Sequence, residues 1–147
     1  MGLVQSIAAL FFRSSKRSST SSDPRHRLGR EGERIAERYL KRAGYKILYR
    51  NFRAPRGGEV DLVCREGDTL VFAEVKTRTS EAFGAPAEAV TREKERLIAR
   101  GALEWLRLLH HPDIYYRFDI VEVRMAAAEP EVTLIRNAFT LPEPYIG

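Results

Sequence analysis

Two acidic residues and one lysine, on two segments separated by a short turn, are the residues of this sequence best suited to chemistry on a phosphate. Asp61 lies in the segment Glu-Val-Asp-Leu-Val, and Glu74 and Lys76 lie in the segment Phe-Ala-Glu-Val-Lys-Thr. Carboxylate oxygens are preferred ligands of Mg²⁺ and Mn²⁺. A lysine ammonium can position water or offset negative charge in a transition state. Together the three side chains suit metal-assisted hydrolysis of a phosphodiester.

The turn between the two segments decides whether these side chains can meet. If the Gly-Asp pair at 67–68 forms the centre of a hairpin turn, Asp61 lies opposite Glu74. Side chains alternate between the faces of a strand, so Lys76 and Glu59 project from the same face as that pair. The opposite face is apolar, and we expect it to be the core. It carries Val60, Leu62, Cys64, Val71, Ala73 and Val75.

Two carboxylates that face each other across a hairpin repel one another unless positive charge lies between them. We therefore expect Asp61 and Glu74 to share one divalent cation, Mg²⁺ or Mn²⁺, with the backbone carbonyl of Val75 as a further ligand. Glu33, on the edge of the preceding helix, could orient a water molecule at the same place. The alternative is a cross-strand salt bridge on a solvated surface, and the spacing of the residues leaves both interpretations open.

Hydrophobic periodicity predicts an α/β protein with the element order α-β-β-β-α-β-β. Apolar residues at helical spacing indicate helices over 28–43 and 88–109. Apolar runs between turn residues indicate five strands, which we place at 45–52, 59–64, 70–77, 115–124 and 132–139. The two segments that carry the acidic residues are thus expected to be neighbouring strands of one sheet.

The composition is typical of a globular domain from a reducing compartment. The chain has 147 residues, of which 44% are hydrophobic and 31% are charged, and we assign one domain to 28–147. No run approaches the roughly 18 apolar residues of a membrane span, so no integral membrane association is expected. The single cysteine, Cys64, cannot form an internal disulfide and favours a cytoplasmic location.

Residues 1–27 form a separate polar tail that is rich in serine and basic residues. Five basic residues and one acidic residue give this segment a net charge of +4, out of +5 for the whole chain. A polar, low-complexity segment cannot bury enough apolar surface to offset the entropy lost on ordering, so we expect the tail to be disordered. Most of the net positive charge is therefore a property of the tail.

The basic segment 41–56, which begins in the last turn of the first helix, is the best candidate for contact with a nucleic-acid backbone. It has no acidic residue, and its cations are Lys41, Arg42, Lys46, Arg50, Arg53 and Arg56. Arg78 and Lys94 could form a second line of phosphate contacts, although a surface network with neighbouring glutamates fits their spacing equally well. Tyr45, Tyr49 and Phe52 could stack on bases, but alternation along a strand favours a place in the core.

An ordered set of short motifs resembles the YraN-like family of bacterial proteins. The set covers about 28–140 and includes Gly32-Glu33, Gly58-Glu59-Val60-Asp61-Leu62-Val63, Phe72-Ala73-Glu74-Val75-Lys76-Thr77-Arg78 and Arg117-Phe118-Asp119. That family is similar to Holliday-junction resolvases and to the wider PD-(D/E)XK nuclease superfamily. The resemblance implies a restriction-endonuclease-like fold, an α/β three-layer core in which a mixed sheet of about five strands is flanked by helices.

The resemblance also implies roles for the acidic residues and the lysine. Asp61 and Glu74 correspond to the metal ligands of the superfamily, Lys76 to its catalytic lysine, and Glu33 to the acid carried by the first helix. The chain departs from the family pattern at Ala73, where a larger apolar residue is commoner, and in its long tail. Neither departure touches the four candidate catalytic residues.

The main prediction is therefore a divalent-metal-dependent endonuclease that hydrolyses phosphodiester bonds in structured or branched nucleic acid, with DNA favoured over RNA. Branched substrates need two cuts, so the superfamily resemblance is also compatible with a homodimer. One alternative is a nucleic-acid-binding module that has the nuclease fold but no catalytic activity of its own. Another is a scaffold for protein partners, which would bind neither nucleic acid nor metal.

Overall fold

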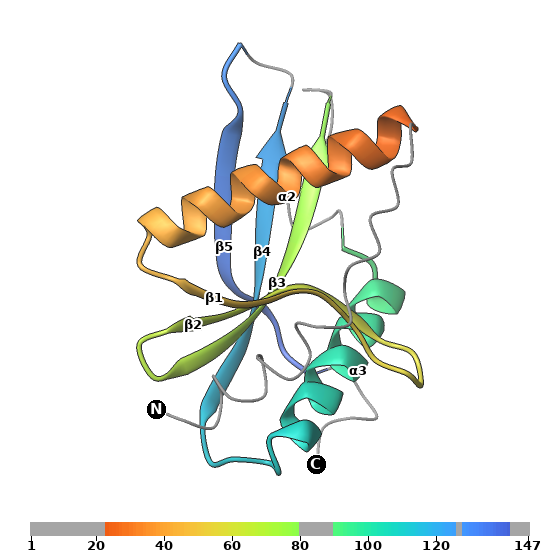
Figure 1. Ribbon diagram of the computed structural model, residues 1–147, viewed down its shortest axis with the longest axis vertical. Coiled ribbons are helices and arrows are strands. Elements are labelled where there is room, and N and C mark those ends of the chain that lie inside the picture. The colour runs from red at the N-terminus through yellow and green to blue at the C-terminus, as the bar shows by residue number, and fades with distance from the viewer. Residues whose placement is uncertain (1–22, 80–89, 126–127, 142–147) are drawn as a thin grey trace.

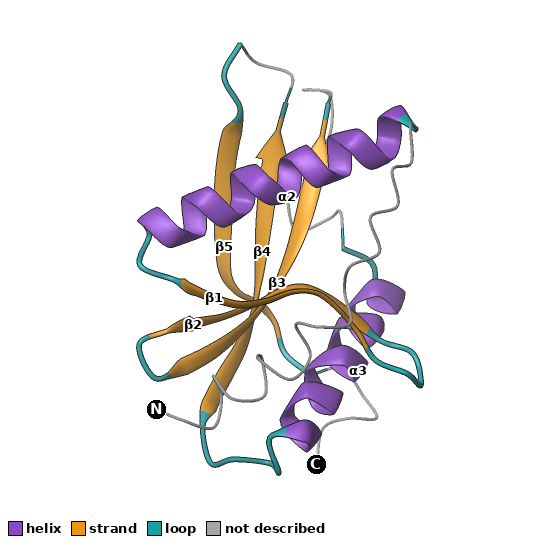
Figure 2. Cartoon of the chain, viewed as in Figure 1, coloured by secondary structure: helices purple, strands orange, loops and turns teal. Residues whose placement is uncertain are grey.

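Five strands form one mixed sheet in the order β1-β2-β3-β4-β5, and one helix lies against each face (Figure 1). The computed structural model describes residues 23–79, 90–125 and 128–141. The elements are α2 (Pro24–Arg42), β1 (Lys46–Arg53), β2 (Glu59–Glu66), β3 (Thr69–Arg78), α3 (Arg92–Leu108), β4 (Tyr115–Arg124) and β5 (Glu131–Phe139). This order confirms the predicted α/β class and is consistent with a restriction-endonuclease-like fold (Figure 2).

Helix α2 begins at Pro24 rather than at position 28, which corrects the predicted start of the first helix. Asp23 caps the helix, because its side chain accepts a hydrogen bond from the backbone N–H of Arg25 at 3.0 Å. Pro24 suits the first helical position, where a missing N–H leaves no hydrogen bond unmade. The rest of the predicted disordered tail, residues 1–22, lies outside the described residues.

Helix α3 begins at Arg92, four residues later than predicted. Thr91 sets this start, because its Oγ1 accepts a hydrogen bond from the backbone N–H of Lys94 at 3.2 Å. Positions 88–89, where the sequence predicted the first helical residues, lie outside the described residues. Among the helices that the structure describes, none combines the length and the apolar character needed to cross a lipid bilayer.

Both faces of the sheet are buried, whereas the sequence predicted one buried face for the hairpin of β2 and β3. Leu40 of α2 packs in one hydrophobic cluster, and Trp105 of α3 packs in the other. Val60 belongs to the cluster on the α3 side, apart from Leu62 on the α2 side. The prediction was wrong because β2 lies between two helical layers, so an uninterrupted apolar run can be buried from both sides.

The hairpin of β2 and β3 has the predicted register. Its antiparallel pairs run from Glu66 opposite Thr69 to Leu62 opposite Ala73. Gly67 lies in the turn with a φ of +57°, a conformation that glycine adopts without strain. After the crossover through α3, β4 pairs in parallel with β3, which makes β3 a central strand with a neighbour on each side.

Candidate active site

Strands β2 and β3 separate at the end of their ladder, and the candidate site lies in the gap between them. The last antiparallel pair joins Leu62 to Ala73, whereas β3 continues to pair with β4 as far as Arg78. In Figure 1 the ribbon of β1 and β2 turns away from β3, β4 and β5. Asp61 and Glu74 are the next residues on the two strands, so both stand where the sheet opens.

Asp61 uses its carboxylate to replace the missing ladder bond. Its Oδ2 accepts a hydrogen bond from the backbone N–H of Val75 at 2.9 Å, which satisfies a donor that separation of the strands has left without a backbone partner. The N–H and C=O of one extended residue point to the same edge of a strand, so the Val75 carbonyl faces the gap as well. Asp61 and the Val75 backbone, both expected in the site, are therefore adjacent.

Glu74 is a buried carboxylate without a full set of partners. The residue is 6% exposed, and its Oε1 lies 3.4 Å from the Nζ of Lys94. Within the described part of the chain, Oε2 has no hydrogen-bond partner. Burial, followed by the charge of Asp61, raises the pKa of Glu74 to about 8. A cation in the gap would supply the positive charge that the ionised form lacks.

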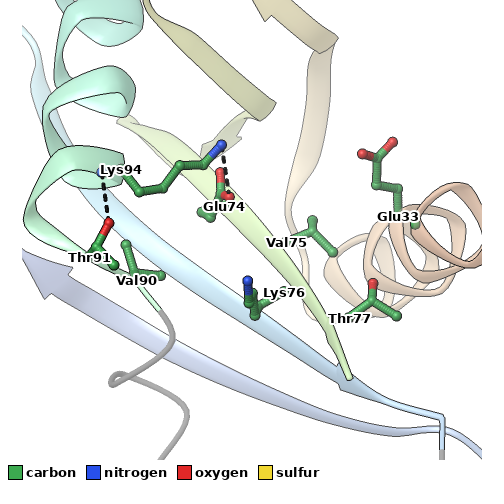
Figure 3. Close-up of a pocket in the computed structure, with 9 residues that line it drawn as sticks. Glu33, Glu74, Val75, Lys76, Thr77, Val90, Thr91 and Lys94 are labelled. Atoms are coloured by element: carbon green, nitrogen blue, oxygen red, sulfur yellow. Dashed lines mark hydrogen bonds and ion pairs between the residues drawn. The ribbon is translucent and has the colours of Figure 1, made fainter. Parts of the chain in front are cut away.

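Lys76 and Glu74 line one cavity, which has a volume of about 460 Å³ (Figure 3). Both side chains come from β3, where alternate residues share a face. Glu33 of α2 and Lys94 of α3 complete the charged part of its wall. The Lys76 amine forms no ion pair with any residue in the described ranges, so it is available to a ligand that enters the cavity.

The acidic neighbour of Lys76 on β4, Glu122, is paired with another residue, so it does not engage the Lys76 amine. The two residues are direct neighbours across the parallel pair of β3 and β4, and Glu122 is fully buried. Its carboxylate is bound instead by Arg124, at 2.7 Å from Nε, and lies 3.7 Å from Nε of Arg78. Sequence reasoning missed Glu122, although a glutamate inside an apolar strand was a signal, and it placed Arg78 among the phosphate contacts.

Glu33 reaches the site cavity from α2, which approaches β3 closely because position 32 is a glycine. A Cβ at Gly32 would lie 1.9 Å from Oγ1 of Thr77. Burial, and then the charge of Asp61, raises the pKa of Glu33, while a hydrogen bond with the side chain of Asn51 lowers it. Asn51 has a φ of +53°, a conformation in which asparagine is enriched. No local pattern distinguished this asparagine as a partner of Glu33.

Lys94 lies in the cavity wall, whereas the sequence left open either a phosphate contact or a surface network with neighbouring glutamates. Its amine forms ion pairs with Glu59 and with Glu74. Helix α3 can bring it there because a Cβ on Gly101 would lie only 3.0 Å from the backbone nitrogen of Glu59. These contacts depend on how α3 crosses β2, and no spacing in the sequence signals them.

The six cations of the basic segment are all exposed, but they do not gather in the site cavity. Lys41 and Arg50 both form ion pairs with Glu37. Arg53 is close enough to the site for its charge to favour the ionised forms of Glu33 and Glu59. None of the six lines the site cavity, and this holds for Lys41, Arg42, Lys46, Arg50, Arg53 and Arg56 alike.

The aromatic residues of the basic segment belong to the core. Tyr45 and Phe52 are each 3% exposed. Tyr49 packs on Trp105 with ring centroids 5.6 Å apart. The core interpretation is therefore confirmed for Tyr45 and Phe52, and neither ring presents a face on which a base could stack.

The gap suits a hard divalent cation that retains part of its water shell. Within the described residues, no group of three or more His, Cys, Asp or Glu side chains is placed to hold a metal ion. Asp61, Glu74 and the Val75 carbonyl form a smaller set of oxygen donors, and Mg²⁺ is usually bound through one or two carboxylates together with water and substrate phosphates. The unpartnered Oε2 of Glu74 is the observation that favours a cation here.

Most of the chain matches a single protein family. Residues 32–123 match the model of the family described as "Uncharacterised protein family UPF0102". The chain belongs to the UPF0102 family. A UPF0102 protein of Geobacter metallireducens is 49% identical over 114 residues, which is 78% of this chain and 93% of that protein. UPF0102 proteins of Rhodococcus opacus and Caldicellulosiruptor saccharolyticus are 48% and 46% identical, each over 76% of this chain and over 95% and 96% of their own lengths.

UPF0102 is the YraN-like family indicated by the sequence motifs, and it is a member of the PD-(D/E)XK-like nuclease superfamily. The matched region contains every residue that we place around the gap and its cavity: Glu33, Asn51, Glu59, Asp61, Glu74, Val75, Lys76, Lys94 and Glu122. It does not include residues 1–31. The family match therefore covers every residue that lines the site cavity except Gly29.

Proposed function

We propose that this UPF0102 protein is a divalent-metal-dependent endonuclease that hydrolyses phosphodiester bonds in structured or branched nucleic acid, DNA rather than RNA. One observation carries the proposal. Two carboxylates, Asp61 and Glu74, stand where β2 and β3 separate, beside the amine of Lys76, which has no ion-pair partner among the described residues. Membership of a nuclease-like superfamily supports the same assignment.

In this proposal Asp61, Glu74 and the Val75 carbonyl hold Mg²⁺ or Mn²⁺. Such a cation supplies Lewis-acid activation of water and offsets negative charge on the phosphate. Lys76 stabilises the charge that develops on a phosphate oxygen, and Glu33 orients the attacking water from the side of α2. Attack of that water on phosphorus breaks one P–O bond of the backbone. One product then ends in a phosphate monoester and the other in a hydroxyl group.

Cleavage assays on a panel of labelled substrates test this proposal. The panel contains four-way junctions, flaps, duplexes and single strands of DNA and RNA, and the full chain is assayed with Mn²⁺ or Mg²⁺. Each of Asp61→Ala, Glu74→Ala and Lys76→Ala should lower the rate on the preferred substrate by at least about a hundredfold, because each removes a group that acts on the reacting phosphate or its cation.

Asp68→Ala is the matched control for these variants. Asp68 is an exposed acid in the turn of the same hairpin, at the end remote from the gap, so its loss should leave the rate unchanged. All variants are purified in parallel. Cleavage that persists undiminished in all three site variants would refute the proposal, because the activity would then come from a contaminant or from another site.

A second candidate function is a nucleic-acid-binding module without turnover. Lys94 favours it, because its ammonium already offsets the charges of Glu59 and Glu74, and a lysine in that position competes with a metal ion. This function predicts binding that weakens steeply with salt, with no metal-dependent cleavage of any substrate on the panel.

A further inference from the structure

A second cavity lies on the α2 side of the gap and shares one wall with the site cavity. It has a volume of about 250 Å³. The residues that line it include Arg30, Glu33, Arg34, Glu37, Arg50 and Asn51. Glu33 also lines the site cavity, so the two cavities are neighbours that share this residue. A chain-like ligand that occupies the gap can therefore extend past Glu33 into the second cavity.

The wall of the second cavity carries more positive than negative charge. Three guanidinium groups face two carboxylates. Glu37 is bound from two sides, by Nε of Arg50 at 2.8 Å and by Nζ of Lys41 at 2.9 Å. These contacts, the hydrogen bond from Arg50 foremost, lower the pKa of Glu37 to about 2. Glu37 is thus already paired with Arg50 and Lys41, and Glu33 is the other carboxylate that lines this cavity with the two arginines of α2.

Those two arginines, Arg30 and Arg34, are close enough on α2 for both to bind one anion. They lie four residues apart on α2, so their side chains project from the same face of the helix, one turn apart. Arg34 is exposed and forms no ion pair with a described residue, and the charge of Arg30 acts on Glu33. A guanidinium offers two parallel N–H donors that match two oxygens of a phosphate. The chemistry of this pair selects a phosphate over a neutral ligand.

Asn51 places the second cavity in line with the gap. On β1 it falls between the pairs that join Arg50 to Leu62 and Phe52 to Val60, so it stands opposite Asp61. Asn51 therefore lines the second cavity and, across the pair of β1 and β2, borders Asp61, where the gap begins. A strand of nucleic acid that leaves the gap on this side meets Asn51 first and the two arginines next.

We propose that Arg30 and Arg34 bind a backbone phosphate of the nucleic acid, the one next along the strand from the phosphate held in the gap. This subsite lies on α2, outside the basic segment that the sequence singled out for phosphate contact. The inference rests on the proposed function for the class of ligand, but it requires neither cleavage nor a bound metal.

Binding of a fluorescein-labelled forked DNA to the full chain, measured by fluorescence anisotropy in EDTA over a range of KCl concentrations, tests the subsite. Arg30→Gln/Arg34→Gln removes both guanidinium groups. Arg27→Gln/Arg38→Gln is the matched control, because it removes two exposed arginines of the same helix that do not line the cavity. Circular dichroism establishes that both variants are folded, and Arg30→Lys/Arg34→Lys retains the charge without the forked donors.

We expect the cavity variant to bind the forked DNA about tenfold or more weakly, with a plot of log affinity against log salt that is less steep by about one unit. The control should bind within about twofold of wild type, and the lysine variant should fall between them. Equal losses in the cavity variant and the control, or no binding by wild type, would overturn the subsite. If the binding difference appears but no substrate is cleaved, the subsite stands and the proposed hydrolysis fails.

Discussion

Asp119 and Glu74 are both buried carboxylates on central strands of the same sheet, yet their surroundings are opposite. Asp119 is fully buried and saturated with donors. Its Oδ1 accepts hydrogen bonds from Nε of Arg117 at 3.0 Å and from the backbone N–H of Asn137 at 2.9 Å, and its Oδ2 accepts one from the hydroxyl of Tyr45 at 2.9 Å. This carboxylate links Tyr45, the residue before β1, to β4 and β5.

Glu74 is almost as deeply buried and has far less support. Its one ion pair, with Lys94, spans 3.4 Å, and its Oε2 has no hydrogen-bond partner in the part of the chain that the structure describes. Buried charged groups are normally satisfied, and exceptions concentrate at sites where a ligand completes the set. The comparison teaches that Asp119 has a full set of partners within the fold, whereas Glu74 is buried with an incomplete set, as the proposed cation site requires.

Asp119→Ala should give the largest change in stability, because it leaves several buried or half-buried donors without an acceptor. Removal of one member of a buried ionic network typically costs about 3–5 kcal/mol. Urea unfolding at neutral pH, followed by circular dichroism, measures the change in the free energy of unfolding. A loss below about 1 kcal/mol would mean that the network around Asp119 has no structural role and would remove the contrast with Glu74.

Glu74→Gln should have the opposite effect on stability, and the effect should depend on pH. The pKa of Glu74 is about 8 in the folded protein and 4.5 in its ordinary state, so the folded state binds more protons between these values. Wild type therefore loses stability as pH rises from about 4.5 to about 8, and the glutamine variant escapes that loss. The variant should become more stable than wild type by up to about 3 kcal/mol at pH 8.

Urea unfolding of both proteins at several pH values, in EDTA, measures this difference. Addition of Mn²⁺ at pH 8 should stabilise wild type and leave the glutamine variant unchanged, because a cation held by the carboxylate replaces the missing partner. A pH-independent difference between the two proteins would show that Glu74 is ionised without strain in the folded state. The claim that Glu74, unlike Asp119, is poorly stabilised as a carboxylate would then be wrong.

The sequence could predict those structural features that depend on residues close together in the chain. The turn at 67–68 and the two-residue alternation of strands were sufficient to place Asp61, Glu74 and Lys76 on facing segments. The order of helices and strands was equally local, because each element has its own periodicity. These predictions concern the fold. The bound metal ion and the disorder of the tail stay predictions.

The partners of the two carboxylates were beyond the reach of the sequence. Asp119 and its donor Arg117 stood in one motif of the YraN-like family, but the other two donors come from positions 74 and 18 residues away in the chain. Lys94 meets Glu74 only because α3 crosses β2 at a glycine. Such contacts depend on how elements pack, and single-chain periodicity carries no information about the angle or depth of that packing.

Glu37 offers the test of the comparison with the smallest expected change in stability. It has two ion-pair partners, but both partners are exposed. Arg50 and Lys41 bind its carboxylate, and their side chains are 49% and 55% exposed. If partner number alone set stability, Glu37→Gln would resemble Asp119→Ala. If burial of the whole pair matters, solvent screening limits the loss to about 1 kcal/mol or less at pH 7. We expect the second result, because water competes for both cations.

The pH dependence of this small loss separates it from a packing effect. The pKa of Glu37 is lowered from 4.5 to about 2 by its hydrogen bond with Arg50. Its contribution to stability is therefore present above pH 4.5 and disappears as pH falls towards 2. Wild type and Glu37→Gln should converge over that range in urea unfolding measured at constant ionic strength. A difference that survives at pH 2 would come from packing of the side chain, and the ordering of Asp119, Glu74 and Glu37 by burial would have to be abandoned.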